Sequence, residues 1–148
     1  PERLAGLAYT RQVVNEAMRL YPPVPAILRE ARRADVVCGT RVPRGAVVAV
    51  LPYVVHRHRR LWDDPDRFDP ERFSPRGRAG RPRLAFLPFS AGPRVCVASA
   101  FATTQILIVV AALARRYRFR LAPGHDVVPV GGFSLIPGGG LWMTVERR

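Results

Sequence analysis

The sequence predicts an α+β fold that is mainly helical and carries small antiparallel sheets. Two segments place apolar residues at helical spacing, one near the start of the chain and a longer one over residues 97–117. Between and after them, short β-branched runs alternate with turns rich in proline and glycine. With 148 residues, of which 48% are hydrophobic, the chain is long and apolar enough to build one folded core.

The first predicted helix is marked by apolar residues that recur along one face, namely Leu4, Leu7, Val14, Met18 and Tyr21. Pro22 and Pro23 end it, because proline lacks an N–H and disfavours helix in the residue before it. Residues 26–33 are then predicted to be extended.

The next segments are predicted from turn residues and β-branched runs. Residues 35–42 form a hairpin around Gly39, residues 46–51 form an apolar strand, and residues 52–60 form a short helix. Residues 61–83 show no periodicity and are predicted to be a long ordered loop, which we call the meander.

Two further elements complete the chain. Residues 97–117 are apolar on most sides, which indicates a buried helix, and arginines near its end suit the helix dipole. Residues 133–145 are predicted to be a β-hairpin around the glycine-rich segment 137–140.

The net charge of +13 invites a nucleic-acid interpretation. The arginines are spread along the chain in short clusters, however, which favours a solvated or partner-facing surface and no nucleic acid. The longest apolar run, residues 106–114, is too short to cross a bilayer, so we expect no membrane span and a cytoplasmic location.

The two cysteines, Cys38 and Cys96, make no disulfide framework and have no neighbouring ligand that would complete a zinc site. His56 and His58 are too close in sequence for the i, i+4 pair of a helical metal site.

The strongest chemical signal is the segment from Phe89 to Cys96, which opens directly onto the apolar helix. A cysteine just before a helix faces unpaired N–H groups and the positive end of the dipole, which favour thiolate. Arg94 adds a cation that can bind a carboxylate, and Gly92 allows a tight turn or a close approach to a flat ligand. Phe89 supplies an apolar face. These residues describe a shielded thiolate beside a planar, carboxylate-bearing cofactor; a buried structural cysteine is the alternative.

A second signal is Glu16-x-x-Arg19 on the first helix, whose spacing places both side chains on one face. An ordinary surface ion pair is the alternative. The later segment Glu71-Arg72-Phe73 supplies an arginine, Arg72, that could complete a cluster of three charges with Glu16 and Arg19.

Taken together, Glu16-x-x-Arg19, then Asp69-Pro70-Glu71-Arg72-Phe73, then Phe89-x-x-Gly92-x-Arg94-x-Cys96 resemble, in order and spacing, three motifs of the cytochrome P-450 family. The resemblance covers residues from about Tyr9 to the end of the chain, and it implies a single partial domain over residues 1–148. That domain would be the C-terminal, haem-ligand portion of the fold.

The resemblance implies a role for each motif residue and haem b as the cofactor. Cys96 would be the axial thiolate ligand of the haem iron, Arg94 and Arg29 would bind haem propionates, and Phe89 would pack beside the thiolate. Glu16, Arg19 and Arg72 would form a structural triad that holds the meander and the cysteine loop.

The sequence departs from the family pattern in two ways. Ala98 stands where members usually have glycine two residues after the cysteine, which is a small intrusion. The family's oxygen-activating helix would precede this chain, so the sequence supplies one wall of a haem pocket.

The resemblance therefore implies a haem-thiolate monooxygenase acting on a small organic substrate. It implies electrons from a ferredoxin, a flavodoxin or a flavoprotein reductase. The N-terminal half could be a separate chain, and a truncated, non-catalytic haem-binding remnant is the alternative. Exposed apolar surface on the helix after Cys96 predicts association or dependence on a partner chain.

Overall fold

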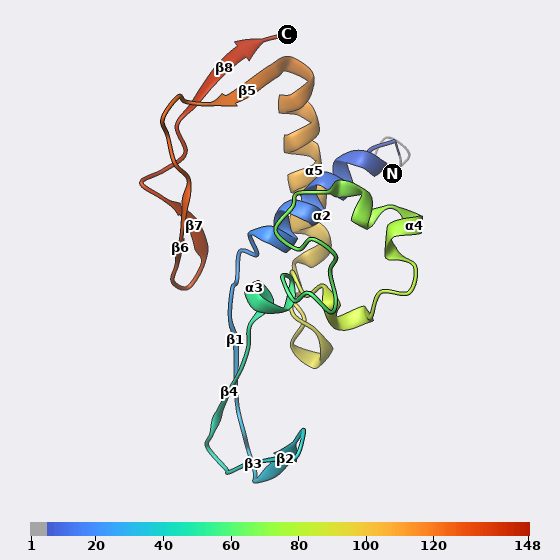
Figure 1. The fold of residues 1–148 in the computed structure, drawn as a ribbon, viewed down its shortest axis with the longest axis vertical. Coiled ribbons are helices and arrows are strands. Elements are labelled where there is room, and N and C mark those ends of the chain that lie inside the picture. Colours follow the sequence, from blue (N-terminus) through green and yellow to red (C-terminus); the bar gives the residue numbers. More distant parts are fainter. Residues whose placement is uncertain (1–5) are drawn as a thin grey trace.

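The computed structural model describes residues 6–148 and confirms small antiparallel sheets beside helices. Two longer helices, α2 (Ala8–Leu20) and α5 (Ser99–Arg116), cross near the centre of the molecule (Figure 1). Helices hold 34% of the residues and strands 22%, so the prediction of a mainly helical fold is wrong. The reason is the content of fifteen prolines and twelve glycines, which interrupt regular structure and leave many short elements.

Helix α2 ends where the sequence predicts, with Tyr21 as its C-cap before the two prolines. Its buried face carries apolar Val14 and Met18 together with the charged residues Glu16 and Arg19. The predicted start at Leu4 lies outside the described residues, and Leu7 is the N-cap.

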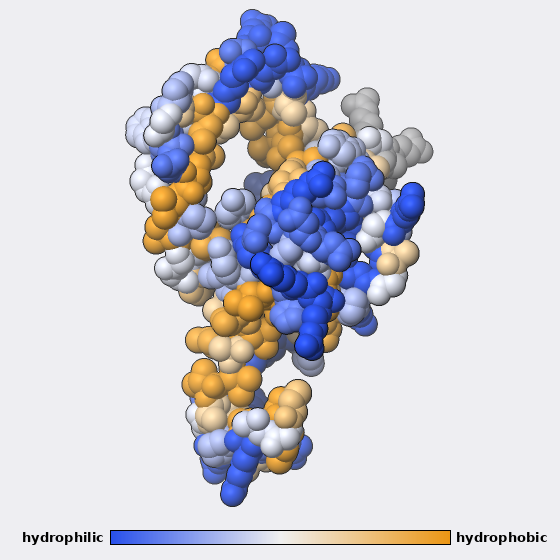
Figure 2. Space-filling model, viewed as in Figure 1, coloured by the Kyte–Doolittle hydropathy of each residue, from blue (hydrophilic) through white to orange (hydrophobic). Residues whose placement is uncertain are grey.

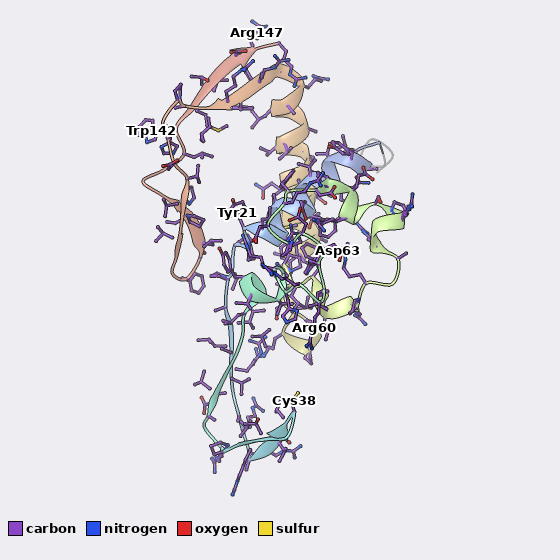
Figure 3. The ribbon with its side chains drawn as sticks, in the orientation of Figure 1. Tyr21, Cys38, Arg60, Asp63, Trp142 and Arg147 are labelled. Atoms are coloured by element: carbon purple, nitrogen blue, oxygen red, sulfur yellow. The ribbon has the colours of Figure 1, made fainter. Side chains whose placement is uncertain are left out.

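The chain then extends into an arm, residues 27–50, that projects away from the helices (Figure 1). Strands β1 (Ile27–Glu30) and β4 (Val47–Val50) pair antiparallel, with Ile27 opposite Val50. At the tip, β2 (Asp35–Val37) and β3 (Thr40–Val42) form the predicted hairpin. Cys38 occupies its turn at the far end of the arm, as Figure 3 shows.

The meander is ordered by short helical turns rather than by long elements. Helix α3 (Pro52–Val55) precedes it and is shorter than the predicted helix over residues 52–60. The meander itself contains η1 (Pro70–Phe73) and α4 (Pro75–Arg78), and η2 (Arg83–Ala85) begins at its last residue. Trp62, Phe73 and Ala85 bury one another beneath it.

A second apolar cluster lies where the long helices cross, formed by Val14 and Met18 of α2 and Leu107 of α5. Phe86 packs against both this cluster and the one under the meander. The loop that precedes the cysteine motif is therefore anchored to both cores.

The predicted C-terminal hairpin over residues 133–145 is wrong, because its two halves pair elsewhere. Strand β7 (Leu135–Gly138) pairs with β6 (Val128–Gly131), and β8 (Met143–Arg147) pairs with β5 (Tyr117–Leu121). The two ladders are nested in the sequence. The outer ladder joins residues from Leu121 and Met143 out to Tyr117 and Arg147, a long-range pairing that local turn residues do not reveal.

Hydrophilic side chains gather over the meander, whereas apolar side chains lie along the arm and the C-terminal strands (Figure 2). Of the residues of α5, Leu107 alone is buried, and Phe101 is 71% exposed. Among the described helices, α5 alone has the length and hydropathy of a membrane span, with a mean hydropathy of 1.2. The core helix of a water-soluble protein meets the same criteria, and Leu107 packs on α2, so this apolar surface fits burial against protein as well as lipid.

Candidate functional site

The residues around Cys96 form a closed loop held by backbone hydrogen bonds. The Cys96 N–H donates to the carbonyl of Phe89 at 3.0 Å, and the Val95 N–H donates to the carbonyl of Gly92 at 3.1 Å. Gly92 has a φ of +72° at the start of η3 (Gly92–Arg94), a conformation that glycine adopts without strain. The loop therefore presents Cys96 on the surface, where its side chain is exposed.

Cys96 lies just before α5, as the sequence predicts. The Ser99 N–H donates to the Cys96 carbonyl at 3.2 Å, and no side chain caps the helix. The uncapped end leaves backbone N–H groups open toward a neighbouring anion. Ala98, the N-cap, has φ −88° and ψ 8°, a conformation that L-residues adopt in turns, so the backbone here does not require glycine.

The structure brings Arg29 and Arg94 together, although 65 positions separate them in the sequence. Both line an open hollow of about 620 Å³ beside Leu28, Glu30 and Arg32. Arg29, on β1, also donates to the hydroxyl of Ser90 in the cysteine loop at 3.3 Å. Among the described residues Arg94 has no hydrogen-bonded or ion-pair partner, so its guanidinium can bind an external carboxylate.

Sequence reasoning did not predict Arg32, which adds a third cation to this hollow against the single carboxylate of Glu30. The sequence did contain an indication of this role, because Arg32 lies only three residues after Arg29, just beyond the end of β1. Three guanidinium groups beside an exposed thiol fit a cofactor that carries carboxylates. Phe89 is half-buried and packs against the α2–α5 cluster, at the base of the same loop.

The predicted triad is assembled in the interior. Arg19 and Glu16 are 0% exposed and form a bidentate pair, with Arg19 Nε at 2.6 Å from Oε2 and a terminal nitrogen at 2.7 Å from Oε1. Arg72 completes the cluster through Nε, 3.4 Å from Glu16 Oε1. The backbone N–H of Asp69 donates to the same oxygen at 2.8 Å.

Arg19 also binds three backbone carbonyls, which sequence reasoning missed. Its guanidinium donates to His56 at 2.8 Å, to Pro65 at 2.6 Å and to Arg67 at 3.0 Å. Backbone acceptors leave no mark in a sequence, so no motif could have indicated them. One buried side chain thereby ties α2 to the end of α3 and to the first part of the meander.

A second arginine layer supports Arg72. The Arg81 guanidinium donates to the carbonyls of Arg72 at 2.6 Å and Gly77 at 2.7 Å, and it lies 4.1 Å from the centre of the Trp62 ring. Burial lowers the pKa of Arg81, and the nearby charge of Arg72 lowers it further. This packing fixes the turn that carries Arg72.

Within residues 6–148, no group of three His, Cys, Asp or Glu side chains could hold a metal ion. Cys38, the other free thiol, lies at the tip of the arm, far from α5 (Figure 3).

Comparison with known proteins agrees with this arrangement. The family model for cytochrome P-450 matches residues 2–141. Cytochrome P-450 4B1 of Rattus norvegicus is 41% identical over 128 residues, covering 86% of this chain and 25% of that protein. Cytochrome P-450 4V2 of Homo sapiens is 33% identical over 148 residues, covering 99% of this chain and 28% of that protein.

Solved structures show the same fold over this length. The retinoic-acid-bound cyanobacterial CYP120A1 superposes with a TM-score of 0.94 at 31% identity, covering 99% of this chain and 34% of that one. The cytochrome P-450 CYP102L1 gives a TM-score of 0.89 at 28% identity. The chain thus spans between a quarter and about a third of the length of these relatives, and over that length it belongs to the cytochrome P-450 family.

Proposed function

We propose that this chain is the haem-ligand portion of a monooxygenase, forming a single partial domain over residues 1–148. Members of the cytochrome P-450 family bind haem b. The observation that carries the proposal is one piece of geometry. An exposed Cys96, on a hydrogen-bonded loop at the start of α5, is joined through Ser90 and Arg29 to a hollow lined by arginines.

The reaction class is the insertion of one oxygen atom of O₂ into a small organic substrate. The second oxygen atom leaves as water, using two electrons from a redox partner and two protons. When bound, the haem would supply this oxygen chemistry, because a thiolate ligand favours cleavage of the O–O bond.

Each residue of the loop has a task in this proposal. Cys96 would supply a thiolate ligand to the haem iron, and Arg94 and Arg29 would bind the propionates of the haem. Gly92 has a positive φ, at which an added Cβ would strain the backbone. Without a side chain at this position, a flat ring can approach the loop closely. Phe89 excludes water from one side of the sulfur, which tunes its electron donation.

The buried triad of Glu16, Arg19 and Arg72 serves as a scaffold and not as a chemical participant. Its members bind one another and backbone carbonyls, and Glu16 and Arg19 are inaccessible to a substrate. The hydrogen bonds of Arg19 supply most of this support, since a buried ion pair is stable only when its remaining donors and acceptors are satisfied, whereas Arg72 Nε contributes an ion pair without a hydrogen bond.

The basic charge of the chain supports the proposal that its electron donor is acidic, such as a ferredoxin, a flavodoxin or a flavoprotein reductase. With a net charge of +13, complementary charge would speed the encounter with such a partner. A cytoplasmic location is supported by the two exposed, unpaired cysteines, because free thiols persist in a reducing compartment.

The test is a reduced, carbon-monoxide difference spectrum of the haem-reconstituted chain, with Cys96→Ser and the matched control Cys38→Ser. The unchanged chain and the control are expected to give the Soret band of a thiolate-ligated haem, and Cys96→Ser is expected to lose it. A thiolate-type band that survives in Cys96→Ser, or its absence from the unchanged chain, would contradict the proposal.

A further inference from the structure

His56 has no part in the scheme above, yet it is 0% exposed and both of its ring nitrogens have partners. It caps the end of α3, between α2 and the cysteine loop. Nδ1 lies 3.2 Å from the backbone carbonyl of Arg19, and Nε2 lies 2.8 Å from the backbone nitrogen of Leu87. The ring therefore spans two segments that are remote in the sequence.

These two partners permit one protonation state. A backbone N–H only donates, so Nε2 must present its lone pair to Leu87. A carbonyl only accepts, so Nδ1 must carry the proton toward Arg19. The neutral ring with its proton on Nδ1 satisfies both partners, whereas a doubly protonated ring would set two N–H groups against each other.

The electrostatics agree with a neutral ring. The pKa of His56 is lowered to about 4, chiefly by burial; the backbone hydrogen bond to Arg19 raises it, and the charges of Arg19 and Arg57 lower it. Phe86 lies against the ring with centroids 5.3 Å apart, and His56 is inaccessible to solvent.

Arg19 and His56 hold each other in both directions. The Arg19 guanidinium donates to the His56 carbonyl at 2.8 Å, while the His56 ring donates to the Arg19 carbonyl. On the other side, the Leu87 carbonyl accepts from the Ser90 N–H at 3.3 Å, and the Phe89 carbonyl accepts from the Cys96 N–H at 3.0 Å. An unbroken series of bonds and short chain segments thus links the buried triad to Cys96.

We propose that His56 is a positioning residue for the Cys96 loop, which it holds to the C-terminal end of α2 through the backbone of Leu87. The functional meaning of the inference rests on the proposed role of Cys96 as thiolate ligand. The hydrogen bond to Leu87 is independent of that role and can be tested without haem.

Two amide variants of His56 test its two hydrogen bonds separately. In His56→Gln the longer side chain reaches the position of Nε2, so its oxygen can accept from Leu87. In His56→Asn the shorter side chain reaches only the position of Nδ1 and can donate to Arg19. His56→Phe keeps an aromatic ring, though a larger one, and makes neither bond, and exposed His58→Asn is the matched control.

The first readout is hydrogen exchange at the Leu87 and Cys96 amides. His56→Asn and His56→Phe are expected to exchange faster by about tenfold or more, the effect of losing one buried hydrogen bond. His56→Gln and His58→Asn are expected to match the unchanged chain. Because His56→Gln and His56→Asn differ by one methylene, a general loss of stability does not predict this division.

The second readout is the reduced, carbon-monoxide difference spectrum after haem reconstitution. In His56→Asn and His56→Phe, a larger share of the haem is expected to give the band of haem without a thiolate ligand. His56→Gln is expected to retain the thiolate-type band. Equal behaviour of all three His56 variants, or protection in His56→Asn with loss in His56→Gln, would overturn the inference. If hydrogen exchange follows the predicted pattern but the unchanged chain gives no thiolate-type band, the result supports the hydrogen bond from Leu87 to His56. The same result contradicts the proposed function.

Discussion

At the scale of single residues, the site depends on Arg19, a buried cation with five partners. It binds both oxygens of Glu16 and three backbone carbonyls from His56, Pro65 and Arg67. Its planar guanidinium matches this set, which the three donors of a lysine could not reproduce. The charge is tolerated in the interior because every one of its partners is in place.

Replacing the carboxylate of Glu16 tests how far the stability of the chain depends on pairing the charge of Arg19. In Glu16→Gln, Arg19 stays buried without its counter-charge, so the free energy of unfolding is expected to fall by about 3–5 kcal/mol. The measurement is denaturant unfolding at pH 7. The control, Glu146→Gln, breaks an exposed pair with Arg120 and should cost less than about 1 kcal/mol. An equal loss of unfolding free energy in the two variants would show that the contribution of Glu16 to stability does not depend on its burial.

His56 makes stability depend on pH in a defined window. Its pKa is about 4 in the folded chain and 6.5 when unfolded, so the unfolded chain binds the extra proton between these values. The free energy of unfolding should therefore decrease as pH falls from 6.5 to 4, by about 3 kcal/mol from this residue. Denaturant unfolding of the unchanged chain and of His56→Phe across that range measures the difference. Parallel pH profiles in the two proteins would refute the assignment.

At the scale of elements, the meander is ordered by close backbone packing and stacked arginines. Short helices η1 and α4 pack on each other, and Gly77 in α4 lies directly against the backbone of η1. A Cβ on Gly77 would sit 2.9 Å from the carbonyl carbon of Arg72 and closer still to the carbonyl oxygen of Glu71. Only glycine permits this approach.

Gly77→Ala should therefore push η1 away from α4 and displace Arg72 from Glu16. We expect the free energy of unfolding to fall by about 1–3 kcal/mol, the usual effect of overpacking. Gly132→Ala is the control, because its added Cβ would meet only ordinary contact at 4.0 Å. Thermal unfolding compares them, and a stability of Gly77→Ala equal to that of the control would contradict the packing argument.

The sequence predicted the local elements better than their long-range partners. The end of α2 at its prolines and the hairpin of β2 and β3 followed from local rules. The pairing of Tyr117 with Arg147 did not, because the two strands are separated by a second ladder. The same holds for the site: its motifs were visible, whereas the carbonyls bound by Arg19 and the bond from Leu87 to His56 depend on backbone groups that no motif marks.

At the scale of the whole molecule, many large apolar side chains are exposed, and contiguous apolar surface promotes association. Phe101 and Ile108 lie two turns apart on one face of α5 and are 71% and 52% exposed. This surface predicts association of the 148-residue chain through α5.

Sedimentation velocity across a range of concentrations measures that association. The unchanged chain is expected to sediment as oligomers, and the double variant Phe101→Gln, Ile108→Gln is expected to shift toward monomer. Phe133→Gln, which changes an equally apolar residue that is 95% exposed in the β6–β7 turn, should leave the distribution as it was. An unchanged chain that sediments as a monodisperse monomer would contradict the prediction.

The central claim is that the sulfur of Cys96 binds the haem iron. Cys38→Ser leaves Cys96 as the only cysteine, since the chain has two. Resonance Raman spectra of the haem-loaded Cys38→Ser chain, prepared with natural cysteine and with sulfur-34 cysteine, report on the iron–sulfur bond directly. The account predicts an iron–sulfur stretching band that moves to lower frequency with the heavier isotope. A haem-loaded chain whose spectrum lacks any band sensitive to this isotope would contradict it.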